Sequence, residues 1–407
     1  MVGPTRRLAA VGISPIDTDL AIQGQKSISQ AESGIILRMV PAPDDTLDMP
    51  ERQQPRLLSA IHSVAPGTAL REGIDSIVDA GTGGLVVVGD VEEFGFMLSG
   101  GIRLDVDFNP ALLYELAKMD GAIVVDSEVS KILWANVQML PDPTIQSSET
   151  GTRHRTAERI SRQVDALVIA ISRRRDVVSI FVDGEKYVLE DIPSVLAKAN
   201  QAMAALATYR ERLDQLCGRL TRAEFDGTAV LYDALSAIQR SEMVVRVAEE
   251  VERFIVELGS EGRLIEIQLE ETLVGVSAVR TALVRDYALD DSEGSIATIS
   301  EGISGLPHHE LLDFGTLAEA LGYDRKLNTL DFDAEPRGYR ALAEVPRLPR
   351  LAIQGLVHRF GSLEELGAAP DDEIASVEGV GPARAKDIRE GLRRVGEAAG
   401  SEKAFNN

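Results

Sequence analysis

The sequence predicts an N-terminal mixed-sheet α/β domain, a helical middle domain and a smaller C-terminal helical domain, and three observations support that order. Between residues 53 and 192, apolar β-branched runs alternate with amphipathic stretches, the pattern of a sheet flanked by helices. From residue 193 onward, apolar residues recur at three- and four-residue spacing, which predicts helices alone. A glycine-rich turn precedes a last helix near residue 382, and the chain's 407 residues are enough for roughly two to four domains.

The expected domain boundaries follow from shifts in composition. Residues 1–52 are rich in Pro, Gly, Ser, Gln and Asp, which is typical of a flexible extension. A polar run at 290–295 interrupts the helical pattern, and a charged tail follows Gly400. We therefore expect an extension at 1–52, the α/β domain at 53–192, a helical linker or bundle at 193–312, a C-terminal helical domain at 313–400 and a tail at 401–407.

The elements of the first domain can be placed in order. A helix is predicted at 69–78, where Leu70, Ile74 and Ile77 share one face. Pro110 stands in the first turn of a predicted helix at 110–119, and another helix is predicted at 152–163. Apolar runs predict strands at 85–88, 122–125, 132–140, 166–172 and 177–182, and a turn at Asp183-Gly184 leads into a last strand at 186–190.

Composition excludes several classes of protein. No uncharged apolar run approaches the ~18 residues of a membrane span, and the first residues do not fit a signal peptide, so we expect a cytoplasmic protein with no membrane partner. One cysteine, Cys217, cannot form an intrachain disulfide, and the five histidines show no zinc-ligand spacing. Any metal is therefore expected to be a hard cation held by carboxylates and phosphates. The net charge of −23 argues against a surface that binds nucleic acid throughout, but it permits a local basic site.

The strongest local signal is the basic motif Arg153-His154-Arg155 at the start of the predicted helix 152–163. Unpaired N–H groups and the positive end of the helix dipole favour an anion there, and arginine binds phosphate through two hydrogen bonds. Basic residues are otherwise unfavourable in a first turn, so their presence indicates a phosphate ligand. The alternative is a set of solvated side chains on an amphipathic helix.

A second motif, Asp120-Gly121-Ala122, separates the predicted helix 110–119 from the apolar strand 122–125. In the functional interpretation, Asp120 binds a divalent cation or polarises a hydroxyl, and Gly121 lets the backbone approach a ligand closely. The alternative is an ordinary Asp-Gly turn.

Two further segments are less specific. Ser172 and the arginines at 173–175 stand at the end of a predicted strand, where they can hold a triphosphate or form a solvated turn. The glycines at 81–84 match no phosphate-loop motif, and we assign them to a turn.

Over about residues 53–400 the chain closely resembles the DNA integrity scanning (DisA) family of diadenylate cyclases. The resemblance rests on the two motifs above, on Gly151-Thr152, and on the runs Ala135-Asn136-Val137-Gln138 and Pro141-Asp142-Pro143-Thr144-Ile145 between them. It implies an enzyme that condenses two ATP molecules into cyclic di-AMP and releases two pyrophosphates. Residues 1–52 fall outside the family's pattern.

The resemblance also implies roles for single residues. Asp120 is expected to act on the ribose 3′-hydroxyl together with Mg²⁺ or Mn²⁺. Met139 is expected near the adenine, where leucine is usual, and this exchange conserves the volume of an apolar contact. The implied ATP-binding set is Asp120, Gly121, Ala122, Met139, Thr152, Arg153, His154, Arg155 and Ser172.

Cyclisation needs two 3′-hydroxyl attacks, so two domains must face each other about a two-fold axis, and each must present one ATP. The enzyme is therefore expected to be at least a dimer. The resemblance implies a homo-octamer that assembles partly through the helical middle.

Residues 377–386 resemble a helix-hairpin-helix motif, whose backbone N–H groups bind DNA phosphate without reading sequence. The alternative is a hairpin that only packs. A second hairpin without glycines is expected at 345–349. By resemblance, the partner is DNA, including branched junctions, and its binding regulates the cyclase in DNA integrity checking. The expected DNA-binding residues are Gly379, Val380, Gly381, Arg384 and Lys386.

One opposing hypothesis remains. In it, the chain is a DNA-binding scaffold whose sheet domain senses a nucleotide without turning it over. Incubation with ATP and Mn²⁺ separates the two hypotheses, because only the enzyme releases cyclic di-AMP.

Overall fold

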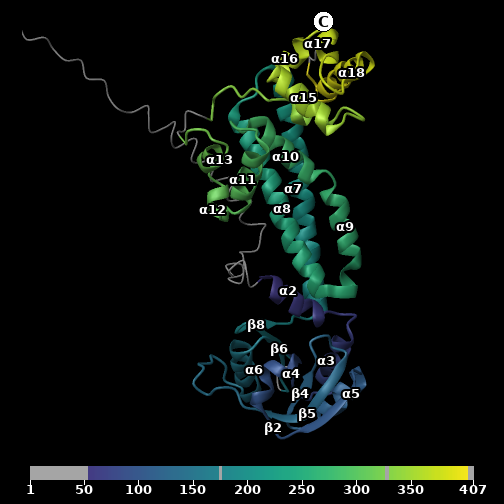
Figure 1. Ribbon diagram of the computed structural model, residues 1–407, viewed down its shortest axis with the longest axis vertical. Helices are drawn as coiled ribbons and strands as arrows, with labels where there is room; N and C mark the ends of the chain where they lie inside the picture. The colour runs from purple at the N-terminus through teal and green to yellow at the C-terminus, as the bar shows by residue number, and fades with distance from the viewer. Residues whose placement is uncertain (1–53, 174–176, 326–329, 402–407) are drawn as a thin grey trace, which may run out of the picture. The chain divides into compact units, whose positions relative to one another are not determined.

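The computed structural model describes residues 54–173, 177–325 and 330–401 (Figure 1). The extension expected at 1–52, Arg174 and Arg175, and residues 402–407 of the expected tail lie outside the described residues. Within the described part of the chain, no helix is long and apolar enough to cross a membrane.

A mixed sheet forms the centre of the first domain, in the strand order β2-β5-β4-β1-β6-β7-β8, with β3 also paired to β5. Strands β1 and β4 are parallel, whereas β5 and β6 run antiparallel to them. The starts of β1 and β4 and the ends of β5 and β6 therefore meet at one edge of the sheet. The strands are β1 (Gly84–Gly89), β2 (Leu98–Ser99), β3 (Ile102–Asp107), β4 (Ala122–Val125), β5 (Lys131–Met139), β6 (Ala166–Ile171), β7 (Val178–Val182) and β8 (Glu185–Val188).

Helices cover both faces of this sheet, because alternate residues of the central strands are apolar and buried. Val86 and Val88 of β1 pack towards α2 (Gln54–Ser63), α3 (Ala69–Asp79) and α5 (Pro110–Ala117). Leu85 and Val87 pack on the other face, with α4 (Val91–Phe94), the 3-10 turn η2 (Gly95–Met97) and α6 (Thr152–Gln163). Each buried aliphatic side chain stabilises the fold by about 1.5–3 kcal/mol. Figure 1 shows α3 and α6 on opposite sides of the strands.

The predicted helices and strands of this domain are confirmed to within a few residues, and α6 begins and ends where the sequence predicted. Strands β2 and β3 were missed. In β3, Ile102, Leu104 and Val106 alternate with charged residues, but this strand has little core to face and is mostly exposed. Gly100 and Gly101, both at positive φ, turn the chain between the two short strands.

The middle of the chain is helical, as predicted, and two long helices pack along each other (Figure 1). Asp191 caps the first of them, and Gly227, in the left-handed conformation, ends it. The helices are α7 (Ile192–Asp226), α8 (Leu231–Leu258), α9 (Arg263–Leu273), α10 (Val276–Tyr287), α11 (Glu293–Ser304), α12 (His308–Leu311) and α13 (Phe314–Ala320), with the 3-10 turn η3 (Gly259–Gly262) after α8. The boundary at 312/313 stays a prediction, although Leu317 and Leu321 beyond it pack in the same core as α8 and α10.

A separate apolar core holds the C-terminal helices together. These are α14 (Tyr339–Ala343), α15 (Arg350–Phe360), α16 (Leu363–Ala368), α17 (Asp371–Ala375) and α18 (Pro382–Ala398). Two connections, at 344–349 and 376–381, have the same length and each contains one residue at positive φ, Arg347 at 61° and Gly379 at 80°. The C-terminal unit thus contains two similar helical hairpins.

Candidate functional site

The topology brings the two sequence motifs to one edge of the sheet. Asp120 stands just before β4, Ser172 just after β6, and Met139 ends β5. Because β1 and β4 start where β5 and β6 end, these residues belong to the same edge. The first turn of α6 carries Arg153 to this edge.

Asp120 and Arg153 form the contact that joins the motifs. The Asp120 Oδ1 atom lies 3.5 Å from Nη2 of Arg153. The Asp120 side chain is fully exposed and that of Arg153 is 39% exposed. An ion pair this open adds little to stability, because water screens both charges. Both groups therefore remain available to a ligand.

Gly121 is required by the packing of two backbones. A Cβ atom at this position would lie 2.5 Å from the carbonyl carbon of Asn136 in β5, closer than real Cβ contacts allow. Asn136 itself has a φ of 54°, at a register shift between β4 and β5. A close approach of Gly121 to a ligand stays a prediction. Ala122 is buried in the sheet core.

Gly83 belongs to the same edge, although the sequence analysis assigned it only to a turn. A Cβ atom here would lie 2.8 Å from Nη1 of Arg153 and 3.0 Å from the carbonyl oxygen of Ile171. The glycine thus leaves room for the Arg153 guanidinium against the end of β6. No sequence motif marks Gly83. The one signal that could have placed it at the sheet edge is its position just before an apolar strand.

The first turn of α6 is open to an anion. Gly151 is the N-cap and offers no side-chain acceptor, and no acidic residue stands in the first turn. The first backbone N–H groups of the helix therefore lack a side-chain cap, as at known phosphate sites. Thr152, the first helical residue, is exposed there.

The three residues of the basic motif do not point to one place. Arg153 contacts Asp120, whereas the ring of His154 packs edge-on against Phe181, with ring centroids 6.2 Å apart. Arg155 donates from Nε to the carbonyl oxygen of Glu149 at 3.3 Å and from Nη2 to that of Thr150 at 3.2 Å. This divergence is expected, because adjacent residues of a helix face different directions.

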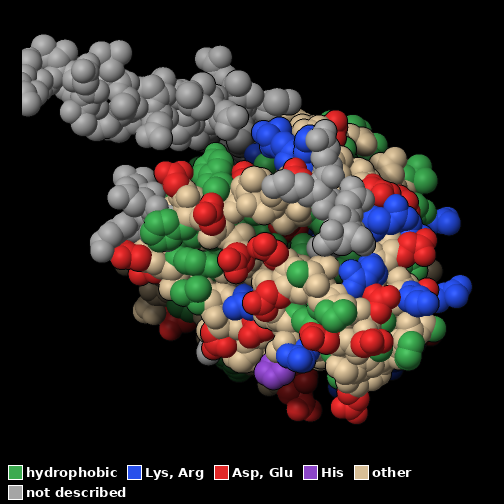
Figure 2. All heavy atoms as spheres, turned by 90° about the horizontal axis from the view of Figure 1, so that it is seen from above, with side chains coloured by type: hydrophobic (Ala, Val, Ile, Leu, Met, Phe, Trp, Pro, Cys, Tyr) green, Lys and Arg blue, Asp and Glu red, His purple; other side chains and the backbone are tan. Residues whose placement is uncertain are grey.

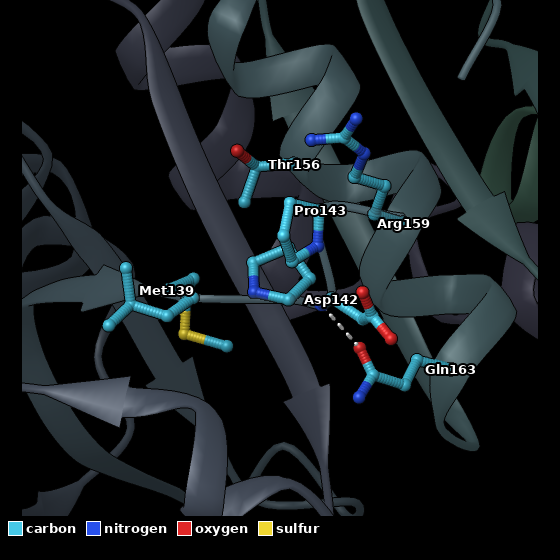
Figure 3. Close-up of a pocket in the computed structure, with 8 residues that line it drawn as sticks. Met139, Asp142, Pro143, Thr156, Arg159 and Gln163 are labelled. Carbon is cyan, nitrogen blue, oxygen red and sulfur yellow. Dashed lines mark hydrogen bonds between the residues drawn. The ribbon is translucent and has the colours of Figure 1, made fainter. Parts of the chain in front are cut away.

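A cavity of about 500 Å³ lies beside α6, within the size range of small-ligand pockets (Figure 3). Figure 3 shows Met139 on one side of the cavity, with Thr156 and Arg159 of α6 opposite. The Asp142 N–H donates to Oε1 of Gln163 at 3.0 Å and ties the cavity wall to the last turn of α6. Of the residues that line it, only Met139 was expected to contact the nucleotide. The lining consists of Met139, Leu140, Pro141, Asp142, Pro143, Thr156, Arg159 and Gln163.

Ser172 turns β6 towards β7, and its N–H donates to the carbonyl oxygen of Val177 at 2.9 Å. Its expected phosphate contact stays a prediction, as do the other nucleotide contacts. Arg173 follows Ser172, and its backbone nitrogen lies near the Gly83 position.

Metal binding at this edge needs the nucleotide. Among the residues that the structure describes, no three His, Cys, Asp or Glu side chains gather to hold an ion. Mg²⁺ commonly takes one or two protein carboxylates and completes its octahedron with substrate phosphates and water. The exposed Asp120 carboxylate beside the uncapped start of α6 fits that kind of shared site.

In the C-terminal unit, the hairpin before α18 exposes Gly379 and Gly381 and buries Val380 in the core. Arg384 donates to the carbonyl oxygen of Gly379, while Lys386 is exposed. Between residues 337 and 394, ten Lys or Arg accompany nine Asp or Glu. The face seen in Figure 2 accordingly mixes both signs of charge, so any DNA contact here must be local.

Comparison with known proteins identifies similar chains. Residues 71–186 match the family model described as DisA bacterial checkpoint controller nucleotide-binding, and residues 189–330 match that of the DisA bacterial checkpoint controller linker region. The DNA integrity scanning protein DisA of Carboxydothermus hydrogenoformans is 47% identical over 342 residues, 84% of this chain and 97% of that protein. The protein of the same name from Streptomyces coelicolor is 45% identical and covers 84% of this chain and 92% of its own length.

A solved structure, a hypothetical membrane spanning protein from Bacillus cereus, is 21% identical and matches 42% of this chain and 95% of its own. The TM-score between the two structures is 0.29.

Proposed function

The chain belongs to the DisA family and is a diadenylate cyclase, and we propose that it condenses two ATP molecules into cyclic di-AMP at the sheet edge that holds Asp120 and Arg153. Family membership over 84% of the chain carries the assignment of the reaction. The pairing of Asp120 with Arg153 beside the uncapped start of α6 supports the location of the site.

The residues suit phosphoryl transfer, which depends on positioning and on stabilisation of charge. Arg153 and the first N–H groups of α6 bind the triphosphate and hold the α-phosphorus in line with the attacking oxygen. Asp120 orients the ribose 3′-hydroxyl and accepts its proton as the oxygen bonds to phosphorus. The bond from the α-phosphorus to the bridging oxygen breaks, and pyrophosphate leaves. A divalent ion, bound by Asp120 and the phosphates, would supply further neutralisation of charge.

The sheet edge of one chain binds one nucleotide. The Asp120 side chain is fully exposed, so this edge is open to a second chain. Two copies of the chain must therefore face each other so that each 3′-hydroxyl attacks the partner's ATP, which makes the active enzyme at least a dimer. We propose the homo-octamer as its assembly, on the family resemblance.

Purified protein incubated with ATP and Mn²⁺ or Mg²⁺ is expected to release cyclic di-AMP and two pyrophosphates for each ring. Chromatography of the nucleotides and a pyrophosphate assay measure both products. Binding of ATP without either product, at several protein concentrations that include the oligomer, would favour the nucleotide-sensing scaffold instead.

The C-terminal hairpins are the proposed DNA contact. The start of α18 has no side-chain cap, the hairpin before it exposes Gly379 and Gly381, and Lys386 adds a charge on the same helix. The sequence-independent nature of such contacts suits branched junctions, and the proposed consequence is control of the cyclase by DNA.

Gly381→Glu combined with Lys386→Glu is expected to weaken junction binding about tenfold or more, because two carboxylates replace a phosphate-binding surface. A Cβ atom at Gly381 meets nothing within 4 Å, so the fold tolerates the change. Fluorescence anisotropy with a four-way junction measures the affinity, and Gly218→Glu, also at an open position in α7, is the matched control. Equal affinity of the hairpin variant and the control would place the DNA site elsewhere.

A further inference from the structure

Residues 142–151, which lead from the end of β5 to the start of α6, have no regular secondary structure and lie along α6; we call this segment the α6 loop. Side chains of α6 hold it at successive points. Gln163 binds the N–H of Asp142, Arg159 donates to the carbonyl oxygen of Ile145 at 2.8 Å, and Arg162 donates to that of Gln146 at 2.7 Å. Arg155 holds its last residues through the carbonyl oxygens already described. The loop therefore runs from the last turn of the helix back to its first.

Glu158 lies at the centre of these contacts and is only 3% exposed. Its Oε2 atom accepts hydrogen bonds from the Ser147 hydroxyl and, at 3.1 Å, from the Ser148 N–H. Its Oε1 atom accepts from the Ser148 hydroxyl at 3.3 Å and lies 2.8 Å from Nη2 of Arg162. A buried carboxylate is costly unless such partners satisfy it, so Glu158 and the loop residues Ser147 and Ser148 must be ordered together.

The chemistry of Glu158 differs from that of its neighbours on the helix. It is the only acidic residue in α6. Arg155, Arg159 and Arg162 bind loop carbonyl oxygens, whereas Glu158 binds the N–H and hydroxyl donors of the loop. Burial opposes its ionisation, but the hydrogen bonds from the loop and the charge of Arg162 together outweigh burial and hold its pKa below the usual value. The Glu158 carboxylate thus stays charged at neutral pH.

Both ends of the α6 loop belong to the nucleotide site. At one end, Asp142 and Pro143 line the cavity beside Met139. At the other end, Gly151 is the N-cap of the helix start that is proposed to bind the phosphates. Fixing the backbone of one residue costs about 1–2 kcal/mol of conformational entropy, so a loop ordered in advance spares the nucleotide that cost.

We propose that Glu158 is a positioning residue for ATP, which holds the α6 loop in its nucleotide-binding shape before the nucleotide arrives. This inference rests on the proposed function, because it assigns the cavity and the start of α6 to ATP. Glu158 acts through Ser147 and Ser148 and does not touch the reacting atoms.

Glu158→Gln is expected to raise the KM for ATP about five- to tenfold and to change kcat less than twofold. The amide keeps the shape of the side chain but loses the charge-assisted hydrogen bonds, so a smaller fraction of molecules is competent to bind. Arg162, whose side chain is 40% exposed, can turn to water. Glu115→Gln, which removes an exposed carboxylate of α5 from a surface pair with Lys118, is the matched control and should leave both constants unchanged.

A second variant keeps Glu158 in place. Ser147→Ala combined with Ser148→Ala removes the loop hydroxyls but preserves the Glu158–Arg162 pair. It is expected to raise KM as well, with faster amide hydrogen exchange at residues 144–150. A fall in kcat or in melting temperature with an unchanged KM, in both variants, would show a purely structural role and overturn the proposal.

ATP affinity measured by calorimetry in an Asp120→Asn background separates this inference from the cyclase proposal. If Glu158→Gln weakens ATP binding there while the parent chain makes no cyclic di-AMP, the positioning role stands and the reaction assignment fails. If the parent chain is an active cyclase and Glu158→Gln leaves its ATP affinity unchanged, the positioning role is refuted alone.

Discussion

Asp120→Asn is expected to lower the rate of cyclic di-AMP formation by at least about a hundredfold, the usual loss when a general base is removed. The amide has nearly the same size and can still accept a hydrogen bond, but it takes up no proton and is a poor ligand for a divalent ion. The Asp120 side chain is fully exposed, so its replacement leaves the fold intact.

ATP binding should survive this change, because the proposed phosphate contacts come from Arg153 and the start of α6. Product formation over a range of ATP concentrations, together with calorimetry, separates turnover from affinity. Asp107→Asn, at an exposed position in β3, is the matched control and should keep the parental rate. Parental activity in the Asp120 variant would remove this residue from the mechanism.

The sequence predicted the layers of the first domain because its strands and helices carry clear apolar periods. Leu85 to Val88 form a buried apolar run, and the helix from Thr152 to Gln163 buries Ala157 and Ile160 on one face, so both elements are marked locally. Strand β3 was missed because its side chains are mostly exposed and contribute little to a core.

The site itself depends on topology, which no local pattern encodes. Asp120 and Arg153 are 33 residues apart, and they meet because β4 starts at the sheet edge that α6 approaches. Gly83 lies beside Arg153 because β1 pairs in parallel with β4, which places the starts of both strands at the same edge. The burial of Glu158 could not be predicted from its place on a helix, because its partners lie in a loop without periodicity. The DNA contacts expected of hairpin residues such as Lys386 stay predictions.

Arg340 and three side chains of the helical middle form a buried polar cluster, which we call the helical joint: Glu224, Asp286, Tyr287 and Arg340. Arg340 is 8% exposed, and its Nη2 atom lies 2.6 Å from Oε2 of Glu224. Glu224 also accepts a hydrogen bond from the Tyr287 hydroxyl at 2.5 Å. Asp286 accepts the N–H groups of Gly338, Tyr339 and Arg340 and so caps the start of α14. Burial, reinforced by the charge of Glu224, raises the pKa of Asp286 to about 7.

Arg340→Ala is expected to destabilise the helical part of the chain by about 3–5 kcal/mol, because it leaves the Glu224 carboxylate buried without its cation. The guanidinium also donates to the Thr221 hydroxyl at 2.7 Å and to the Cys217 carbonyl oxygen at 3.2 Å, and the variant loses both hydrogen bonds. Arg325→Ala, which breaks an exposed pair with Asp313, is the matched control and should cost no more than about 1 kcal/mol.

Amide hydrogen exchange measures this effect better than a single melting curve, since a chain with several domains need not unfold in one step. Protection should fall in α7, α10 and α14, whereas the sheet has its own core and should keep both its protection and its ATP affinity. Losses no larger in Arg340→Ala than in Arg325→Ala would show that the joint contributes nothing beyond a surface pair.

A double variant identifies the source of the loss. If the unpaired Glu224 charge dominates, adding Glu224→Gln to Arg340→Ala should restore a large part of the stability, since the amide is cheaper to bury than a lone carboxylate. If the lost arginine hydrogen bonds dominate, the double variant should be as unstable as the single one. The first result would mean that the ion pair mainly fixes how α14 meets α7 and adds little net stability, as is common for buried pairs.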